Sequence, residues 1–257
     1  MNVAFKMNGN DKYFKRIPKR VYKYFEIDAN LKNTLKENYL WLSNCSNFND
    51  PYDCYFNLLD IRPTEENLLK HILHGQEKNA HIIEAYKDYI RDKPEELKAV
   101  FKIALEPLIY QRGICCFSRS FDNLLLWSHY TAKHKGICLG FDPTVDPETF
   151  IIVNVNYIKE FTAKDYHSEE EDALIFLFAT KSKHWQYEKE MRILKPFTGR
   201  LPFKKHALKE VIFGCKINHR DLNEVIQIVK GAGYEDVTFK RAQMKDNSFA
   251  LDFIKIK

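Results

Sequence analysis

The stretch 181–195 holds the densest group of side chains that could do chemistry. Glu188, Glu190 and Arg192 are spaced two residues apart, so in an extended strand they share one face. Burying two carboxylates and a guanidinium costs several kcal/mol unless they pair or meet a ligand. The spacing therefore predicts a face that lines a cleft or meets solvent, and not a core face. The competing interpretation is an edge strand whose Glu and Arg side chains neutralise each other in water.

Length and composition place the chain among globular proteins. Its 257 residues are 45% hydrophobic and 14% aromatic, which is enough for the core of a single domain over 1–257. No signal peptide is evident, and no apolar run approaches the ~18 residues of a membrane span, so we expect a cytoplasmic protein without a membrane partner. The six cysteines include no C-x-x-C pair, which predicts buried thiols rather than disulfides or zinc ligands.

Basic residues are concentrated at the start of the chain, although the net charge of +5 is modest. This basic N-terminal arm, 1–20, could contact phosphates, and a solvated terminus is the simpler interpretation. No repeat, low-complexity tract or Gly/Ser linker marks a domain boundary.

The hydrophobic pattern switches between strand-like and helix-like segments without the regular alternation of a doubly wound sheet. Besides one in 181–195, strands are predicted at 21–25, 39–43, 113–118, 135–141, 151–157, 210–214, 236–241 and 248–255. Helices are predicted at 29–38, 123–134, 173–182 and 220–230. Helical spacing over 64–112 predicts an insertion of three helices near 64–74, 78–91 and 94–111, the last kinked or broken at Pro107. The fold class that follows is α+β, with a mainly antiparallel sheet and a helical insertion.

Two polar clusters stand out from these elements. Asn49 and Asp50 lie at the tip of a turn rich in Asn and Asp, where turn chemistry alone accounts for them. The helix at 123–134 places Trp127, His129 and Tyr130 within one turn, although a lone helical histidine is usually structural or exposed.

The opening strand, helix and second strand form a compact unit. If the strands at 21–25 and 39–43 share a sheet, Tyr22, Lys23 and Ser43 lie near one another.

Motifs spread over 21–214 resemble, in their order, a bacterial family catalogued as domain of unknown function 2971. The matching segments are Tyr22-Lys-Tyr24, Phe48-Asn-Asp-Pro51 with Asp53, Cys116-Phe-Ser118, Asp122-Asn123, Trp127-Ser-His-Tyr130, Lys135-Gly-Ile137, Gly140-Phe141, Tyr157 and Trp185 through Arg192. This resemblance supplies almost no chemistry.

A second resemblance bears on the chemistry. The opening strand-helix-strand, the Phe-Ser-x-Ser of 117–120 and the Glu-Lys-Glu of 188–190 are similar to parts of arginine-type ADP-ribosyltransferases. That family places a basic residue on its first strand, a serine-containing second strand and a Glu-x-Glu strand around NAD. The resemblance implies the split sheet of that family, NAD as substrate, and a protein or nucleic acid as the ADP-ribose acceptor. It also implies NAD glycohydrolase activity as an alternative, and a role as a toxin or anti-phage effector.

The same resemblance implies roles for three residues in catalysis. Glu190 would hydrogen-bond the nicotinamide-ribose hydroxyl and stabilise the oxocarbenium-like charge that forms as nicotinamide leaves. Glu188 would orient the acceptor, and Ser118 would support Glu190. His129 is a further catalytic candidate.

Other residues would bind the nucleotide. Tyr22 or Tyr130 would stack on nicotinamide, and Lys23 or Arg192 would meet the diphosphate. The remaining expected contacts are Tyr24, Asn49, Asp50, Trp127 and Trp185. The sequence departs from the family where Lys23 stands in place of Arg or His and where Ser-Arg-Ser replaces Ser-Thr-Ser.

Two other classes of function stay open. A hydrolase or nuclease could gather a divalent ion with Asn49, Asp50, Asp53, Glu188, Glu190 and His129, but their spacing matches no fixed metal motif and no metal site is assigned. A non-catalytic module could recognise a nucleotide or a nucleic-acid strand through the Trp/Tyr/His cluster, with phosphate contacts from the basic arm.

Overall fold

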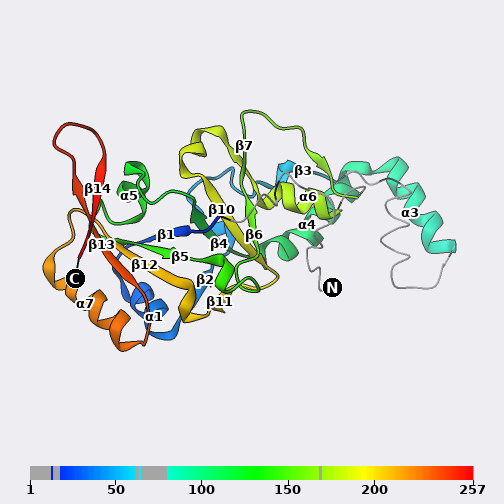
Figure 1. The fold of residues 1–257 in the computed structure, drawn as a ribbon. Coiled ribbons are helices and arrows are strands. Elements are labelled where there is room, and N and C mark those ends of the chain that lie inside the picture. Colours follow the sequence, from blue (N-terminus) through cyan, green and yellow to red (C-terminus); the bar gives the residue numbers. More distant parts are fainter. Residues whose placement is uncertain (1–12, 14–17, 62–63, 65–79, 168–169, 257) are drawn as a thin grey trace.

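An eight-stranded sheet runs through the molecule in the computed structural model, which describes residues 13, 18–61, 64, 80–167 and 170–256 (Figure 1). From edge to edge its strands are β14 (Leu251–Lys255), β13 (Thr238–Met244), β12 (Leu208–Phe213), β5 (Ile137–Phe141), β1 (Val21–Phe25), β4 (Gly113–Ser118), β10 (Glu190–Lys195) and β6 (Ile152–Asn154). Every neighbouring pair is antiparallel except β12 with β13. The predicted α+β fold with a mainly antiparallel sheet is confirmed.

Three two-stranded sheets accompany the large one. They pair β2 (Tyr39–Leu42) with β11 (Gly199–Pro202), β3 (Leu59–Asp60) with β8 (Lys164–Asp165), and β7 (Asn156–Ile158) with β9 (Thr180–Ser182). The strands predicted at 21–25 and 39–43 therefore belong to different sheets. The assumption that these two strands share a sheet is wrong. Ser43 nevertheless approaches the large sheet, because its backbone exchanges hydrogen bonds of 2.9 and 2.8 Å with Ile114 of β4.

The described helices agree in place with most predictions. They are α1 (Ala29–Glu37), α3 (Ala80–Asp92), α4 (Pro94–Tyr110), α5 (Leu124–Tyr130), α6 (Glu170–Phe178) and α7 (His219–Gly231). Short 3-10 helices are η1 (Cys45–Asn47), η2 (Phe56–Leu58), η3 (Pro143–Val145), η4 (Lys183–Glu188) and η5 (Lys205–Ala207). The predicted helix at 64–74 and most of the basic arm lie outside the described residues.

Four boundaries differ from the sequence analysis. The helix α4 runs through Pro107 without ending there. The helix α5 stops at Tyr130 because residues 132–134 all have positive φ, which a continuing helix cannot contain. The segment 173–182 divides into the end of α6 and the strand β9, and 151–157 divides between β6 and β7, which lie in different sheets.

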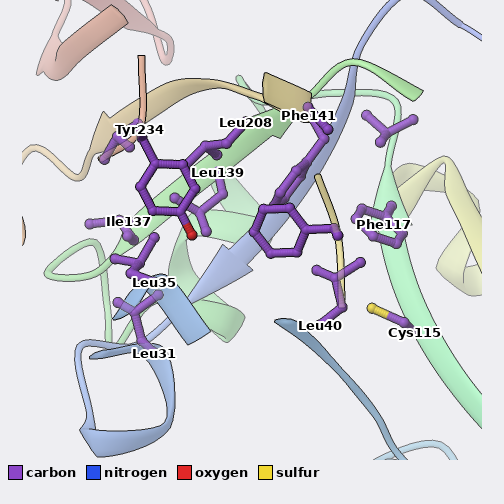
Figure 2. Packing of buried hydrophobic residues seen from close by; sticks show 14 of the residues in the cluster. Leu31, Leu35, Leu40, Cys115, Phe117, Ile137, Leu139, Phe141, Leu208 and Tyr234 are labelled. Atoms are coloured by element: carbon purple, nitrogen blue, oxygen red, sulfur yellow. The ribbon is translucent and has the colours of Figure 1, made fainter. Parts of the chain in front are cut away.

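Apolar side chains fill the space between the sheet and α1 and α7, which lie on the same side of it (Figure 1). Leu31 and Leu35 of α1 lie beside Ile137 of β5 and belong to the same cluster as Leu139 and Phe141, as Figure 2 shows. Opposite this core, Trp127 of α5 packs in a separate cluster with Tyr22, Ile212 and Leu251.

The six cysteines are free thiols, four of them buried, as predicted. Among the described residues, no helix has the length and apolar character needed to cross a bilayer.

Candidate functional site

A cavity of about 480 Å³ opens where β1, β4 and β10 lie side by side. Its lining comes from these strands, α5, β9, η4 and the segment after β2. Ten of the predicted site residues line it: Tyr22, Lys23, Tyr24, Asn49, Ser118, His129, Tyr130, Trp185, Glu188 and Glu190. Asp50, Trp127 and Arg192 do not.

Strand register explains this convergence. Ser118 at the end of β4 lies opposite Tyr22 of β1 on one side and opposite Glu190 of β10 on the other. Residues directly opposite each other in neighbouring strands project to the same face of a sheet. Since Tyr22 and Ser118 are the one registered pair between β1 and β4, the strands separate beyond it. The Lys23 ammonium bridges the gap by donating to the Cys116 carbonyl at 3.2 Å.

A buried ion cluster forms the floor of the cavity, with the Lys181 ammonium at its centre. The Lys181 Nζ lies 2.6 Å from Glu188 Oε2, 3.2 Å from Glu190 Oε2 and 3.5 Å from Asp53 Oδ2. All four side chains are at most 5% exposed. Burial alone would lower the pKa of Lys181, but the three carboxylates outweigh it and raise that pKa.

Arg192 forms the second cation of this cluster. Its two terminal nitrogens each donate to Asp53 at 2.7 Å, its Nε donates to Glu190 Oε1 at 2.8 Å, and Nη1 also reaches the Phe178 carbonyl at 2.8 Å. The guanidinium is fully buried and is not part of the cavity lining. It therefore does not reach the cavity surface, where a diphosphate would have to meet it.

Glu188 and Glu190 line a cleft, as expected, but the expectation that they share one strand face with Arg192 is wrong. The strand begins at Glu190, whereas Glu188 ends η4 and Lys189 between them has a left-handed backbone with φ 47°. The edge-strand interpretation is also wrong, because β10 pairs with β4 on one side and β6 on the other. Burial is possible because Asp53 and Lys181 complete the charge pairing.

The two glutamates differ in how many acceptor positions they have left. Glu190 Oε2 receives hydrogen bonds from both Lys181 and Arg192, while Oε1 receives the Arg192 Nε. Burial would raise the pKa of Glu190, but these two cations hold it at about 2. Glu188 receives one hydrogen bond on each oxygen, from the Tyr130 hydroxyl at 2.7 Å and from Lys181. A carboxylate oxygen can accept two, so Glu188 keeps capacity for a ligand.

Ser118 and Tyr130 hold the Glu188 segment in place. The Ser118 hydroxyl donates to the Glu188 main-chain carbonyl at 2.6 Å, whereas the sequence analysis expected Ser118 to support Glu190. Burial, followed by the charge of Glu188, raises the pKa of Tyr130, which keeps its hydroxyl protonated as a donor. From α5, the N-cap residue Asn123 also donates to the Tyr187 carbonyl at 2.8 Å.

Aromatic rings and one imidazole complete the walls. The Lys181 Nζ lies 4.9 Å from the ring centroid of Trp185, a cation–π distance. His129 is exposed, whereas Trp127 is fully buried and its indole nitrogen donates to the Phe121 carbonyl at 2.7 Å. Asp50 is buried in its turn, where Oδ1 accepts from the Tyr52 amide.

The carboxylates proposed for a divalent ion surround a lysine instead. Asp53, Glu188 and Glu190 all face the Lys181 ammonium. Within the described part of the chain, no group of three His, Cys, Asp or Glu side chains has an arrangement that could hold a metal ion.

Asp53 and Lys181 were not among the residues assigned to the NAD site from the sequence. Asp53 appeared only as a family motif residue and a metal-ligand candidate, and it lies 139 positions from Arg192 in the chain. Lys181 belongs to the stretch 181–195, but a single lysine carries no spacing signal.

Comparison with known families gives a match over part of the chain. The model of the family described as Protein of unknown function (DUF2971) matches residues 126–193. This supports the first resemblance over a shorter range than 21–214, and the matched segment contains Tyr130, Lys181, Glu188, Glu190 and Arg192. Neither the curated proteins nor the solved structures gave a match, so no comparison supports the ADP-ribosyltransferase resemblance.

Proposed function

We propose that the protein is an NAD-consuming enzyme, an ADP-ribosyltransferase or NAD glycohydrolase, whose cavity holds the nicotinamide end of NAD. The observation that carries this proposal is the adjacency of β1, β4 and β10. The resemblance requires a basic residue, a serine and a Glu-x-Glu pair around one site. Lys23, Ser118, Glu188 and Glu190 line the same cavity, one group from each strand or its immediate flank.

The charge of the site suits the reaction. When the bond between ribose C1′ and the nicotinamide nitrogen breaks, its electron pair goes to nicotinamide and positive charge develops on the ribose. Water or an acceptor then bonds to C1′ and gives up a proton. Three carboxylates and two cations give the buried cluster a formal charge of −1, from +2 and −3. A preorganised negative site stabilises such developing positive charge.

The acceptor positions reverse the roles that the sequence suggested for the two glutamates. Glu190 already accepts three hydrogen bonds from Lys181 and Arg192, so it fixes the cluster. Glu188 has an open position on each oxygen and lines the cavity, so we assign it the contact with a ribose hydroxyl and the developing charge.

The walls suit a flat heteroaromatic ring. Tyr22, Tyr130 and Trp185 line the cavity, and the volume of about 480 Å³ lies within the range of small-molecule sites. Lys23 supplies a positive group at the same wall for a phosphate oxygen.

Release of free nicotinamide from NAD tests the proposal. The wild-type protein should release it, and Glu188→Gln should lower kcat by roughly 100-fold or more because the charge facing the ribose is lost. Glu160→Gln, an exposed carboxylate outside the cavity lining, is the matched control. Absence of both nicotinamide release and calorimetric NAD binding would reject the proposal. Loss of NAD in producing cells, relieved by Glu188→Gln, would extend it to a toxin or anti-phage role.

A nucleotide-binding module without catalysis is the second candidate. The pairing of Glu190 with two cations favours it, since a buried carboxylate used only in pairing can shape a site without acting in it. Saturable NAD binding with no nicotinamide release, unchanged by an added protein or nucleic-acid acceptor, would select this candidate.

A further inference from the structure

We infer that Lys181 is a positioning residue, whose ammonium aims the Glu188 carboxylate and the Trp185 ring at the cavity. The inference rests on the proposed function, which gives Glu188 its chemistry. Of the three carboxylates around Lys181, Glu188 is nearest, with an Nζ to Oε2 distance of 2.6 Å. The same ammonium faces the Trp185 ring at 4.9 Å.

The backbone of Lys181 is fixed independently of η4, which carries Glu188 and Trp185. Lys181 lies on β9, in parallel register with Tyr157 of β7. The Tyr157 hydroxyl in turn accepts a hydrogen bond of 2.7 Å from the Glu190 amide at the start of β10. Lys181 is therefore anchored to β7, which is itself linked to β10, before its side chain reaches η4.

Two donors on different oxygens define the orientation of the Glu188 carboxylate. Lys181 binds Oε2 and Tyr130 binds Oε1. Without the ammonium, Glu188 keeps one neutral donor and faces Glu190 and Asp53, with Arg192 as the remaining cation of the cluster. The formal charge becomes −2, from +1 and −3, and repulsion turns Glu188 away from its position.

A double-mutant cycle measures this dependence. Lys181→Met and Glu188→Gln should each lower kcat for nicotinamide release by roughly 100-fold with a smaller change in KM, since both affect charge stabilisation. If Lys181 acts through Glu188, the double variant should be no slower than Glu188→Gln. The double variant should also fold more readily than Lys181→Met alone, because it loses one charge of each sign. Additive losses in the double variant would overturn the inference.

Chemical rescue separates positioning from packing. Ethylammonium added to Lys181→Ala should restore part of kcat and raise the thermal unfolding midpoint, whereas ethanol of similar size should do neither. A rise in the midpoint without recovery of kcat would make Lys181 a structural counter-ion only and overturn the inference. An inactive wild-type protein would instead reject the proposed function, so the two failures are distinguishable.

Discussion

The two faces of β10 are both buried, yet they are built from opposite chemistries. On one face Met191 and Ile193 join the apolar core; on the other Glu190 and Arg192 join the ion cluster. None of the four is more than 6% exposed. Alternation along a strand usually separates core from solvent, but here it separates two kinds of interior.

The difference teaches what each kind of burial requires. An apolar side chain gains from any apolar neighbour, so its stabilisation depends on volume and area. A buried charge gains only from particular partners at particular distances, and it is destabilising without them. The apolar face should therefore tolerate conservative changes, whereas the ionic face should not.

Of the substitutions that distinguish the two faces of β10, Arg192→Met should change the free energy of unfolding most. The change leaves the buried carboxylates of Asp53 and Glu190 without their guanidinium partner. We expect a loss of about 3–5 kcal/mol in the free energy of unfolding, the cost of breaking a buried ion pair from one side. Urea denaturation measures it.

A charge-balanced double variant is the control for that prediction. Asp53→Asn combined with Arg192→Met removes one charge of each sign and should recover a large part of the loss. If Arg192→Met alone unfolded at the same urea concentration as the wild-type protein, the two faces of β10 would not differ as we describe.

The next largest effect is a dependence of the free energy of unfolding on pH, to which, of the two faces of β10, only the ionic face contributes. The pKa of Glu190 falls from 4.5 to about 2 on folding, because the cations outweigh burial. A depressed folded-state pKa gives stability that is fully present above the unfolded value and is lost as pH falls through the folded value. The free energy of unfolding should thus fall between about pH 4.5 and pH 2.

Other carboxylates also titrate in acid, so the control is a difference between two proteins. Glu190→Gln lacks this group, and its stability should change less between pH 4.5 and pH 2 than that of the wild type. Parallel pH curves for the two proteins would contradict the role given to Arg192 and Lys181.

Much of the fold could be predicted because its signals are local. The aromatic strand at 21–25 and the helix beginning at Ala29 are visible in short windows, and Asp28 caps that helix by accepting from the Leu31 amide. The end of α5 was missed, since nothing in its composition requires the positive φ values of residues 132–134.

Most residues of the candidate site could be predicted from the sequence, but their arrangement in space could not. The predicted site residues were recognised by side-chain type, and ten of them line one cavity. The alternation of Glu188, Glu190 and Arg192 looked like a strand face because a left-handed residue at Lys189 leaves no trace in the pattern. The burial of Arg192 depends on Asp53, which lies 139 positions away. Single-sequence spacing contains no information about such a partner.

Conservative substitutions at two neighbouring positions, one on each face of β10, should give the smallest changes in the free energy of unfolding. Ile193→Val removes one methylene from a fully buried apolar site and should cost about 1 kcal/mol. Arg192→Lys keeps the charge, but a single ammonium cannot reproduce the two parallel bonds to Asp53 together with the bond to Glu190. Its cost in urea denaturation should be at least about twice that of Ile193→Val. Equal costs would mean that charge alone matters on the ionic face, and that the fork geometry of Arg192 contributes nothing.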